Sequence, residues 1–337
     1  MSTTPYSTAR QHSQTTIVPS SDIDAAIEMA ALVPAIEAAF AAYENGTAQM
    51  PAKSYIDLPQ HNGDFRSMPA YLETGDWEAS GIKWVNVHPD NPDEFDLPTV
   101  MGTLVYTDPE SGFPLAVMDA TTLTMQRTGA AAAVATDHLA VEDASSLGIV
   151  GAGVQSYTQL EAISQVRPIE TVVVSDLDDD RVQRFVDTFG DEFDVRAGTV
   201  PEAAQCDVLS TVTPVEDPIV TLDDLGAHTH VNAMGADAEG KQELHTDVVR
   251  EATLVIDDLE QTTHSGEINV PWSEGDIDES DVDAELGEIV AGNAPGREAL
   301  SGRTVFDSTG LAIQDIAAAR IVYESLGEDG GRRVEML

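Results

Sequence analysis

The chain has 337 residues, 42% of them hydrophobic, and its formal net charge is −44. This length predicts two domains rather than a single core, and the hydrophobic content excludes global disorder. Sixteen Lys and Arg residues against sixty Asp and Glu residues leave no basic surface for phosphates, so nucleic acid is not an expected partner.

The acidic residues are spread along the whole chain and are not gathered in one tail. Repulsion on this scale opposes compaction in dilute buffer, whereas at molar salt the screening length falls to about 3 Å. We therefore expect a protein from a halophile, adapted to a cytoplasm at molar salt. The one cysteine, Cys206, fits a reducing compartment, and no apolar run reaches the roughly 20 residues of a membrane span. These observations predict a cytoplasmic protein.

The first region, taken in chain order, is predicted to be mixed and rich in strands. The Ser/Thr-rich residues 1–20 are expected to be frayed, and Ser20-Ser21-Asp22 predicts the start of a helix over 23–32. Pro34 is then expected to open a second helix that ends near Gly46. Predicted strands follow at 53–58, 64–68, 80–87, 99–106 and 114–118, the last two joined by a turn over 108–112.

An alanine-rich helix over 128–139 is expected to cross into a second region, where short apolar runs alternate with helices. That alternation predicts a parallel, doubly wound sheet in an α/β fold. An acidic loop over 273–288 leads into a short helix, and the last helix, after Thr309-Gly310, is expected to pack back on the first domain. The candidate strands are 147–150, 171–175, 208–212, 230–234 and 254–256, and the candidate helices are 159–166, 179–189, 201–205 and 243–250.

The segment Gly151-Ala152-Gly153-Val154-Gln155-Ser156 directly follows a predicted strand and precedes a helix. Gly151 permits a tight turn, and Gly153 lets the backbone approach a pyrophosphate, which then lies on the amides of the helix end. Asp176, at the end of the next strand, can accept hydrogen bonds from a ribose 2′-OH and would repel a 2′-phosphate. The pattern predicts a Rossmann-type domain that binds NAD, although Arg181 leaves NADP open.

Lysine occurs only at positions 53, 83 and 241, so each is expected mainly where chemistry or packing demands it. Arg66, Lys83 and Arg127 are three cations in the first 130 residues. A guanidinium suits a carboxylate, and burial can bring a lysine pKa towards neutrality, which makes the amine a usable acid or base. Asp237 ends a predicted strand at a Gly-flanked turn. A structural ion pair is the competing explanation for each arginine, and ordinary turn chemistry is the one for Asp237.

Taken together, these segments resemble the ornithine cyclodeaminase/μ-crystallin family, over nearly the whole chain from about residue 20. The resemblance implies a Rossmann-type doubly wound domain at 128–307, paired with a discontinuous mixed α+β domain at 1–127 with 308–337. The second of these would bind substrate and form a homodimer. The segments that carry the resemblance are RSMP at 66–69, GIKWVNVHPDNP, RTGAAAA, GAGVQS, NAMGADAEGKQEL, ELGEIVAG with PGR, and FDSTGLAIQD.

The resemblance also implies roles for individual residues. Lys83 is similar to the family's substrate lysine, Asp237 to its catalytic acid/base, and Arg127 to an arginine near the substrate carboxylate and the cofactor. Arg66 stands where cyclodeaminases carry a glutamate suited to the second ammonium of ornithine, and where the family's archaeal-type alanine dehydrogenases carry arginine. The positions implied to contact the dinucleotide are Thr99, Arg127, Gly151, Gly153, Val154, Gln155, Asp176, Thr213, Met234, Lys241 and Ser308.

These roles imply a reversible, NAD-dependent oxidative deamination of L-alanine to pyruvate and ammonia. Arg66 and Arg127 would hold the carboxylate, Lys83 would polarise the reacting centre and move its proton, and Asp237 would activate water. Ornithine cyclodeaminase, a cyclic ketimine or pyrroline-2-carboxylate reductase, and a catalytically silent ligand-binding protein remain alternatives. No metal site is expected, because the histidines are scattered. The expected partners are a small amino acid or 2-oxo acid and a second copy of the chain, with no membrane.

Overall fold

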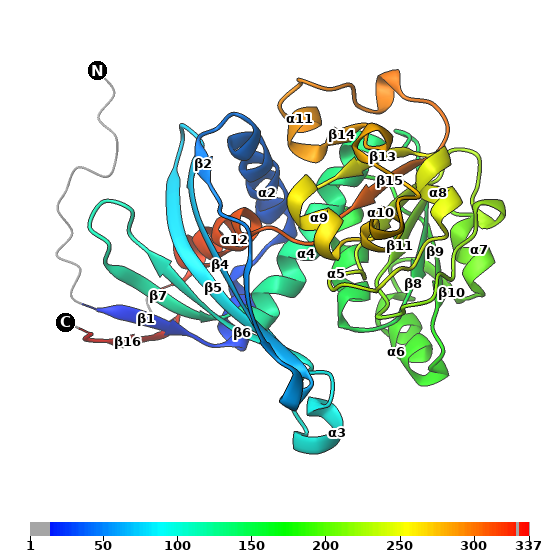
Figure 1. Cartoon of the computed structure of the whole chain (residues 1–337). Coiled ribbons are helices and arrows are strands. Elements are labelled where there is room, and N and C mark those ends of the chain that lie inside the picture. The colour runs from blue at the N-terminus through cyan, green and yellow to red at the C-terminus, as the bar shows by residue number, and fades with distance from the viewer. Residues whose placement is uncertain (1–13, 328–329, 337) are drawn as a thin grey trace.

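The computed structural model describes residues 14–327 and 330–336. Its strands form two separate sheets, here called sheet A and sheet B, which lie in the two halves of the molecule. Helix α4 (Ala120–Leu139) runs between them, and both described chain ends lie on the side of sheet A (Figure 1).

Sheet A is mixed. Its strands are β1 (Thr15–Val18), β2 (Ala48–Gln49), β3 (Ser54–Leu58), β4 (Gly63–Glu73), β5 (Glu78–Val87), β6 (Val100–Thr107), β7 (Pro114–Asp119) and β16 (Arg332–Val334). The order is β16-β1-β7-β6-β5-β4-β2, with β3 paired to β4, and only the β1–β7 pair is parallel among these described strands. Helix α12 (Ala312–Ser325) packs on β4 and β5 and against α2 (Met29–Glu44), so the last helix returns to the first domain as predicted.

Sheet B is parallel throughout its described strands. They are β8 (Ser146–Val150), β9 (Thr171–Ser175), β10 (Asp194–Ala197), β11 (Val208–Thr211), β12 (His230–Ala233), β13 (Thr253–Ile256), β14 (Ala284–Glu285) and β15 (Thr304–Asp307). The strand order is β10-β9-β8-β11-β12-β15-β13-β14. From β8 the chain first adds β9 and β10 on one side, and it then returns to add β11 and the later strands on the other side. The doubly wound parallel sheet is thus confirmed, and its order reverses between β8 and β11, where such sheets bind ligands.

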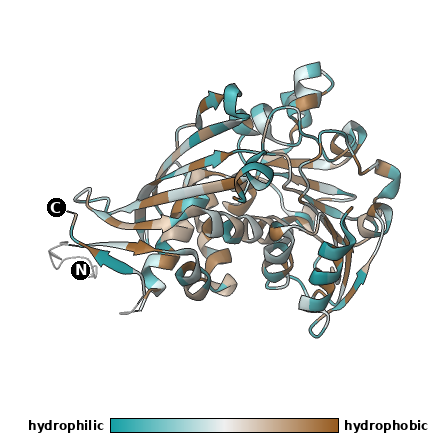
Figure 2. Ribbon diagram, turned by 90° about the horizontal axis from the view of Figure 1, so that it is seen from below, coloured by the Kyte–Doolittle hydropathy of each residue, from teal (hydrophilic) through white to brown (hydrophobic). Residues whose placement is uncertain are grey.

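The remaining helices are short connections around the two sheets. They are α1 (Ser20–Ala26), α3 (Asn91–Phe95), α5 (Val154–Ile163), α6 (Asp179–Phe189), α7 (Val200–Ala204), α8 (Thr246–Glu251), α9 (Leu259–Ser265), α10 (Asn269–Glu274) and α11 (Leu286–Val290), with single turns at Pro59–His61, Leu222–Asp224, Glu279–Asp281 and Arg297–Ala299. In Figure 2 the hydrophobic segments concentrate in the strands and in the helices between the sheets, whereas the outer loops are mainly hydrophilic.

The N-terminal predictions were wrong in two places. Thr15–Val18, expected to be frayed, forms β1 between β7 and β16, because Val18 is buried and the Thr15 hydroxyl donates to the carbonyl of Pro114 at 2.7 Å. Residues 1–13 lie outside the described residues. The helix break falls at 27–28 and not before Pro34, which lies inside α2. The bend lets one helix face bury Leu32 and its neighbours, and this packing outweighs the missing amide of Pro34.

Two helix starts were also placed too late. Helix α4 begins at Ala120 because the Asp119 carboxylate accepts hydrogen bonds from the amides of Thr121 and Thr122. Helix α5 begins at Val154, directly after the glycine-rich turn, and ends at Ile163. Strands β1, β2, β10, β14, β15 and β16 were not predicted. Among the described residues no single helix is long and apolar enough to cross a membrane, and α1 with α2 passes that test only as a pair bent by 91°.

Candidate active site

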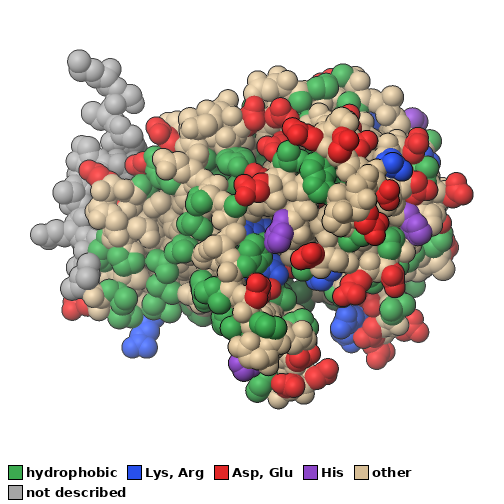
Figure 3. All heavy atoms as spheres, viewed as in Figure 1, with side chains coloured by type: hydrophobic (Ala, Val, Ile, Leu, Met, Phe, Trp, Pro, Cys, Tyr) green, Lys and Arg blue, Asp and Glu red, His purple; other side chains and the backbone are tan. Residues whose placement is uncertain are grey.

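A cleft of about 660 Å³ lies between sheet A and the carboxyl ends of the sheet B strands β8, β11 and β12. In the space-filling view, acidic side chains are scattered over this face, and Lys or Arg side chains are visible in a hollow near its centre (Figure 3). The predicted site residues that line the cleft are Arg66, Lys83, Thr99, Arg127, Gly153, Val154, Gln155, Thr213, Met234, Asp237, Lys241 and Ser308. The other two predicted residues, Gly151 and Asp176, do not line the cleft. They directly follow β8 and β9, respectively.

Lys83 and Arg127 share one carboxylate, Asp315. Lys83 on β5 is only 1% exposed, and its Nζ lies 2.8 Å from both carboxylate oxygens and 3.4 Å from the hydroxyl of Thr124. Arg127 on α4 donates from Nε to Asp315 Oδ1 at 3.0 Å and from Nη1 to Gln314 Oε1 at 3.1 Å. Asp315 was missed from the sequence. The available signal was a charged residue on the otherwise apolar face of the last helix.

Burial lowers the pKa of Lys83 to about 7; Asp315 counteracts that shift, and Arg127 adds to it. A lysine in this state exchanges its proton near neutral pH, as a catalytic acid or base requires. Arg127 forms the ion pair that was the competing explanation from the sequence, and it also lines the cleft.

Arg66 and Asp237 belong to a second charged group in the cleft. Arg66 binds Asp64 through two donors, at 2.8 and 3.0 Å, and its Nη1 donates to the backbone carbonyl of Asp237 at 3.1 Å. Lys241 Nζ lies 2.6 Å from Asp237 Oδ1. Burial opposes ionisation of Asp237, yet Lys241 and Arg66 lower its pKa below the ordinary value. The carboxylate is therefore expected to be ionised, and because its side chain is 36% exposed it is accessible from the cleft.

Lys53 also lines the cleft, although the sequence suggested no specific role for it. Its Nζ donates to the backbone carbonyl of Thr309 at 2.8 Å, and it has no carboxylate within ion-pair distance among the described residues. Burial lowers its pKa to about 8. An ammonium held by a single carbonyl in a cleft retains donors for an anionic ligand.

The glycine-rich turn has the geometry expected of a dinucleotide cradle. Gly151 has φ +102°, and a Cβ there would lie 2.9 Å from the carbonyl of Val212. A Cβ on Gly153 would meet no protein atom within 4 Å, so that side of the backbone is open for a ligand. Asp176 Oδ2 accepts from the amide of Ala152 at 2.6 Å and so ties the turn to β9.

Three further features fit NAD at this place. Helix α5 starts at the turn without a side-chain cap, which leaves its first amides for a phosphate. Gln155 Oε1 is a buried acceptor that has no hydrogen-bond partner among the described residues. The turn also lies at the point where the strand order of sheet B reverses. The residues present therefore fit the pyrophosphate and ribose of a dinucleotide.

Two buried carboxylates that sequence reasoning missed hold the loops around the cleft. Glu243 accepts from the amide and hydroxyl of Thr213, both at 2.7 Å, and from the amide of Gly235 at 3.0 Å. Asp257 accepts from the amides of Thr309 and Gly310 at 2.7 and 2.9 Å. Burial raises the pKa of both carboxyl groups. No local motif distinguishes them, because their donors come from distant parts of the chain.

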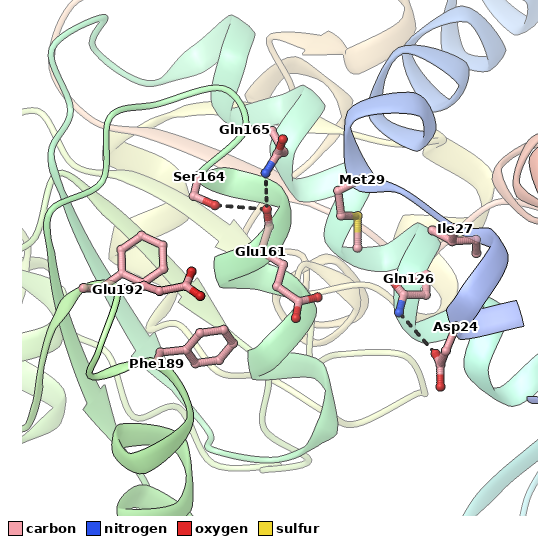
Figure 4. Close-up of a pocket in the computed structure, with 10 residues that line it drawn as sticks. Asp24, Ile27, Met29, Gln126, Glu161, Ser164, Gln165, Phe189 and Glu192 are labelled. Carbon is pink, nitrogen blue, oxygen red and sulfur yellow. Dashed lines mark hydrogen bonds between the residues drawn. The ribbon is translucent and has the colours of Figure 1, made fainter. Parts of the chain in front are cut away.

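A second cavity, of about 560 Å³, lies apart from these residues between α1, α4, α5 and the end of α6 (Figure 4). Three carboxylates face it, from Asp24, Glu161 and Glu192, together with Phe189 and Phe193. It contains none of the predicted site residues.

The comparisons with known proteins agree with the geometry. Residues 13–330 match the Ornithine cyclodeaminase/mu-crystallin family. The chain belongs to this family. The resemblance inferred from the motifs is thereby confirmed, and the two-sheet architecture around one cleft is that of a family member.

Individual relatives are similar over almost their whole length. Alanine dehydrogenase of Archaeoglobus fulgidus is 44% identical over 325 residues, which cover 96% of this chain and 98% of the relative. A solved archaeal alanine dehydrogenase dimer with bound NAD has a TM-score of 0.91 at 44% identity, covering 96% of this chain and 100% of that one. Δ1-pyrroline-2-carboxylate reductase of Thermococcus litoralis, in complex with NADH and L-proline, has a TM-score of 0.89 at 36% identity, covering 95% and 100%.

Proposed function

We propose that the protein oxidises L-alanine with NAD and water to pyruvate, ammonium and NADH, reversibly. The chain is an NAD-dependent amino-acid dehydrogenase, as its family, its dinucleotide cradle and its relatives agree. The observation that favours alanine as the substrate is the pattern of ion pairs among the charged side chains of the cleft. Lys53 has no carboxylate within ion-pair distance among the described residues, and Arg66 and Arg127 line the cleft although each is also paired with an acid. The carboxylates of Asp237 and Asp315 are already bound to cations. A substrate with one carboxylate and an uncharged side chain fits this set.

In this proposal Arg66, Arg127 and Lys53 bind the substrate carboxylate and orient its Cα. NAD, when bound, accepts the hydride from that carbon. Lys83, as the neutral amine, takes a proton from the substrate ammonium before the hydride leaves. Asp237, kept ionised by its cationic neighbours, takes a proton from the water that attacks the resulting imine carbon. Lys83 then returns its proton to the nitrogen, which leaves as ammonia, and the hydroxyl derived from water gives its remaining proton to Lys83 as the carbonyl of pyruvate forms.

We propose NAD rather than NADP as the physiological cofactor. Asp176 directly follows β9, where the ribose of a dinucleotide would lie, and a carboxylate there repels a 2′-phosphate. Arg181, which left NADP open, lies 3.4 Å from the Asp178 carboxylate and is engaged by an acid.

A pyrroline-2-carboxylate reductase is the second candidate. Apolar side chains, including those of Met68, Val85 and Met125, line the cleft beside the cations and suit a ring as well as a methyl group. The relative from Thermococcus litoralis supports this alternative. Ornithine cyclodeamination is disfavoured, because ornithine brings a second ammonium for which the described lining offers no unpaired carboxylate.

The decisive experiment compares initial rates at molar KCl. L-alanine or L-ornithine is supplied with NAD, and Δ1-pyrroline-2-carboxylate is supplied with NADH. Saturable NADH release with alanine is expected. A cyclodeaminase would return its hydride and release proline without accumulating NADH. If only the cyclic imine is turned over, the reductase assignment replaces this one.

We also propose a homodimer, formed through the face of sheet A that points away from Lys83. Side chains alternate along a strand, so Ile82 and Trp84 lie on that outer face, where they are 37% and 42% exposed. Trp84 stacks on Phe65, with ring centroids 5.3 Å apart, and Ile56 on β3 is 52% exposed. A solved relative is a dimer, which supports a second copy as the occupant of this surface.

The expected domain division, 1–127 with 308–337 and 128–307, is retained as a proposal. It separates the strands of sheet A from those of sheet B and divides α4, which begins at Ala120. We further propose a halophilic, cytoplasmic protein, on the basis of the net charge of −44 and the unpaired Cys206.

A further inference from the structure

The two cations predicted to act on the substrate depend on the same buried side chain. Asp315 is 0% exposed, and its carboxylate contacts Lys83 on β5 and Arg127 on α4, two elements far apart in sequence. No other carboxylate lies within ion-pair distance of either cation among the described residues.

Asp315 lies in the first turn of α12, where the helix dipole favours a negative charge. With two cations beside it, the group carries a net positive charge when Lys83 is protonated. A buried charge imbalance of this kind is costly and is relieved by loss of the lysine proton or by arrival of an anion.

We propose that Asp315 is a positioning residue of the active site, which holds Lys83 and Arg127 in fixed relation at the cleft and supplies the one negative charge that they share. The role rests on the proposed function, in which Lys83 exchanges a proton with the substrate. Binding of a substrate carboxylate then supplies a second negative charge and favours the protonated form of Lys83. Substrate binding and the protonation of Lys83 are coupled through this one carboxylate.

Several other charged groups face the same cleft. They are Lys53, before β3; Arg66, on β4; and the pair Asp237 and Lys241, after β12. Lys53 opposes protonation of Lys83, as Arg127 does. No hydrogen bond or ion pair joins any of these four side chains to Asp315. Replacing Asp315 or Arg127 therefore changes the charge next to Lys83 and leaves these groups in place.

The scarcity of lysine makes a direct test possible. Protein grown with [13Cε]lysine gives NMR signals from only Lys53, Lys83 and Lys241, which Lys53→Arg and Lys241→Arg variants assign. In the wild type, the Lys83 signal is expected to titrate near pH 7. Asp315→Asn keeps the shape of the side chain but removes its charge, and it should lower that midpoint by at least one pH unit, a tenfold loss of proton affinity.

Arg127→Met provides a second variant in case Asp315→Asn does not fold. It leaves Asp315 to Lys83 alone and removes a repelling cation, so the Lys83 midpoint should rise by about one unit. The matched control is Asp258→Asn. Asp258 is another buried carboxylate, and it binds the hydroxyl of Tyr43 at 2.8 Å instead of Lys83. This control should leave the Lys83 midpoint unchanged.

The proposal is overturned if the Lys83 midpoint stays within 0.3 unit of the wild-type value in every folded variant of Asp315 and Arg127. It is also overturned if the Asp258 control shifts the midpoint as much as they do. The titration needs no substrate, so its outcome is independent of whether alanine is oxidised. Where activity is present, the pH profile of kcat/KM should move with the NMR midpoint, which a purely structural ion pair would not cause.

Discussion

Substitution of the two glycines of the cofactor turn separates backbone strain from ligand access. Gly151 has φ +102°, and an alanine Cβ there would lie 2.9 Å from the carbonyl of Val212 and 3.0 Å from Cγ2 of Thr213. A non-glycine residue in such a conformation costs about 1–3 kcal/mol. For a domain of this size that cost lowers Tm by roughly 2–12 °C. Gly151→Ala should therefore lose both stability and NAD affinity, the latter by about tenfold or more.

Gly153→Ala is the matched control. Gly153 has φ −79° and ψ −172°, which alanine adopts freely, and no protein atom lies within 4 Å of the added Cβ. Its Tm should stay within a degree or so of the wild-type value, while NAD affinity falls because the methyl group stands where the pyrophosphate approaches. Thermal unfolding without cofactor and calorimetric titration with NAD give the two quantities. Wild-type NAD affinity in Gly153→Ala would refute the placement of the pyrophosphate, and wild-type stability in Gly151→Ala would refute the strain.

Three further predictions concern catalysis and assembly. Lys83→Ala should lower kcat by about 100- to 10,000-fold while calorimetry finds NAD affinity nearly unchanged, and near-wild-type turnover would contradict the mechanism. Because the Lys83 pKa is about 7 and alanine oxidation needs the neutral amine, kcat/KM for alanine should rise as pH increases through 7. Pyruvate amination needs the ammonium form, so its kcat/KM should fall over the same range; parallel profiles would count against Lys83. Ile56→Glu should convert the proposed dimer to a monomer in light scattering, whereas Leu177→Glu, at a fully exposed position in the loop after β9, should not.

The fold was predictable where its signals are local. The strand–turn–helix pattern around Gly151 and the alternation after it depend on neighbours in sequence, and they led to the doubly wound sheet. The errors lie where contacts with distant segments of the chain determine the local structure. Strand β1 forms because β7 and β16 flank it, and Pro34 stays inside a helix because the buried face of α2 compensates for one lost hydrogen bond. Neither partner is visible in the local pattern.

The same division holds for the site. Arg66, Lys83 and Asp237 could be selected because each lies in a recognisable segment and has a side chain suited to the reaction. Asp315 and Glu243 could not be selected, because their importance comes from what the fold brings to them. Asp315 matters because it contacts two cations, and Glu243 matters because it accepts hydrogen bonds from the amides of two loops. Lys53 was noticed because lysine is rare in this chain, but only the fold shows that it lines the cleft.

All three lysines of this acidic chain line the one cleft. The surface carries acids whose mutual repulsion is screened over about 10 Å at 0.1 M salt and about 3 Å at 1 M. The contacts in the cleft are direct and buried, so salt that screens the surface weakens them far less. Arginine can provide a permanent positive charge both on the surface and in the cleft, but it cannot release a proton at neutral pH. Lysine can, because burial lowers the pKa of Lys83 to about 7 and that of Lys53 to about 8. On the proposed function, proton transfer to the substrate is therefore the reason why position 83 carries lysine and not arginine.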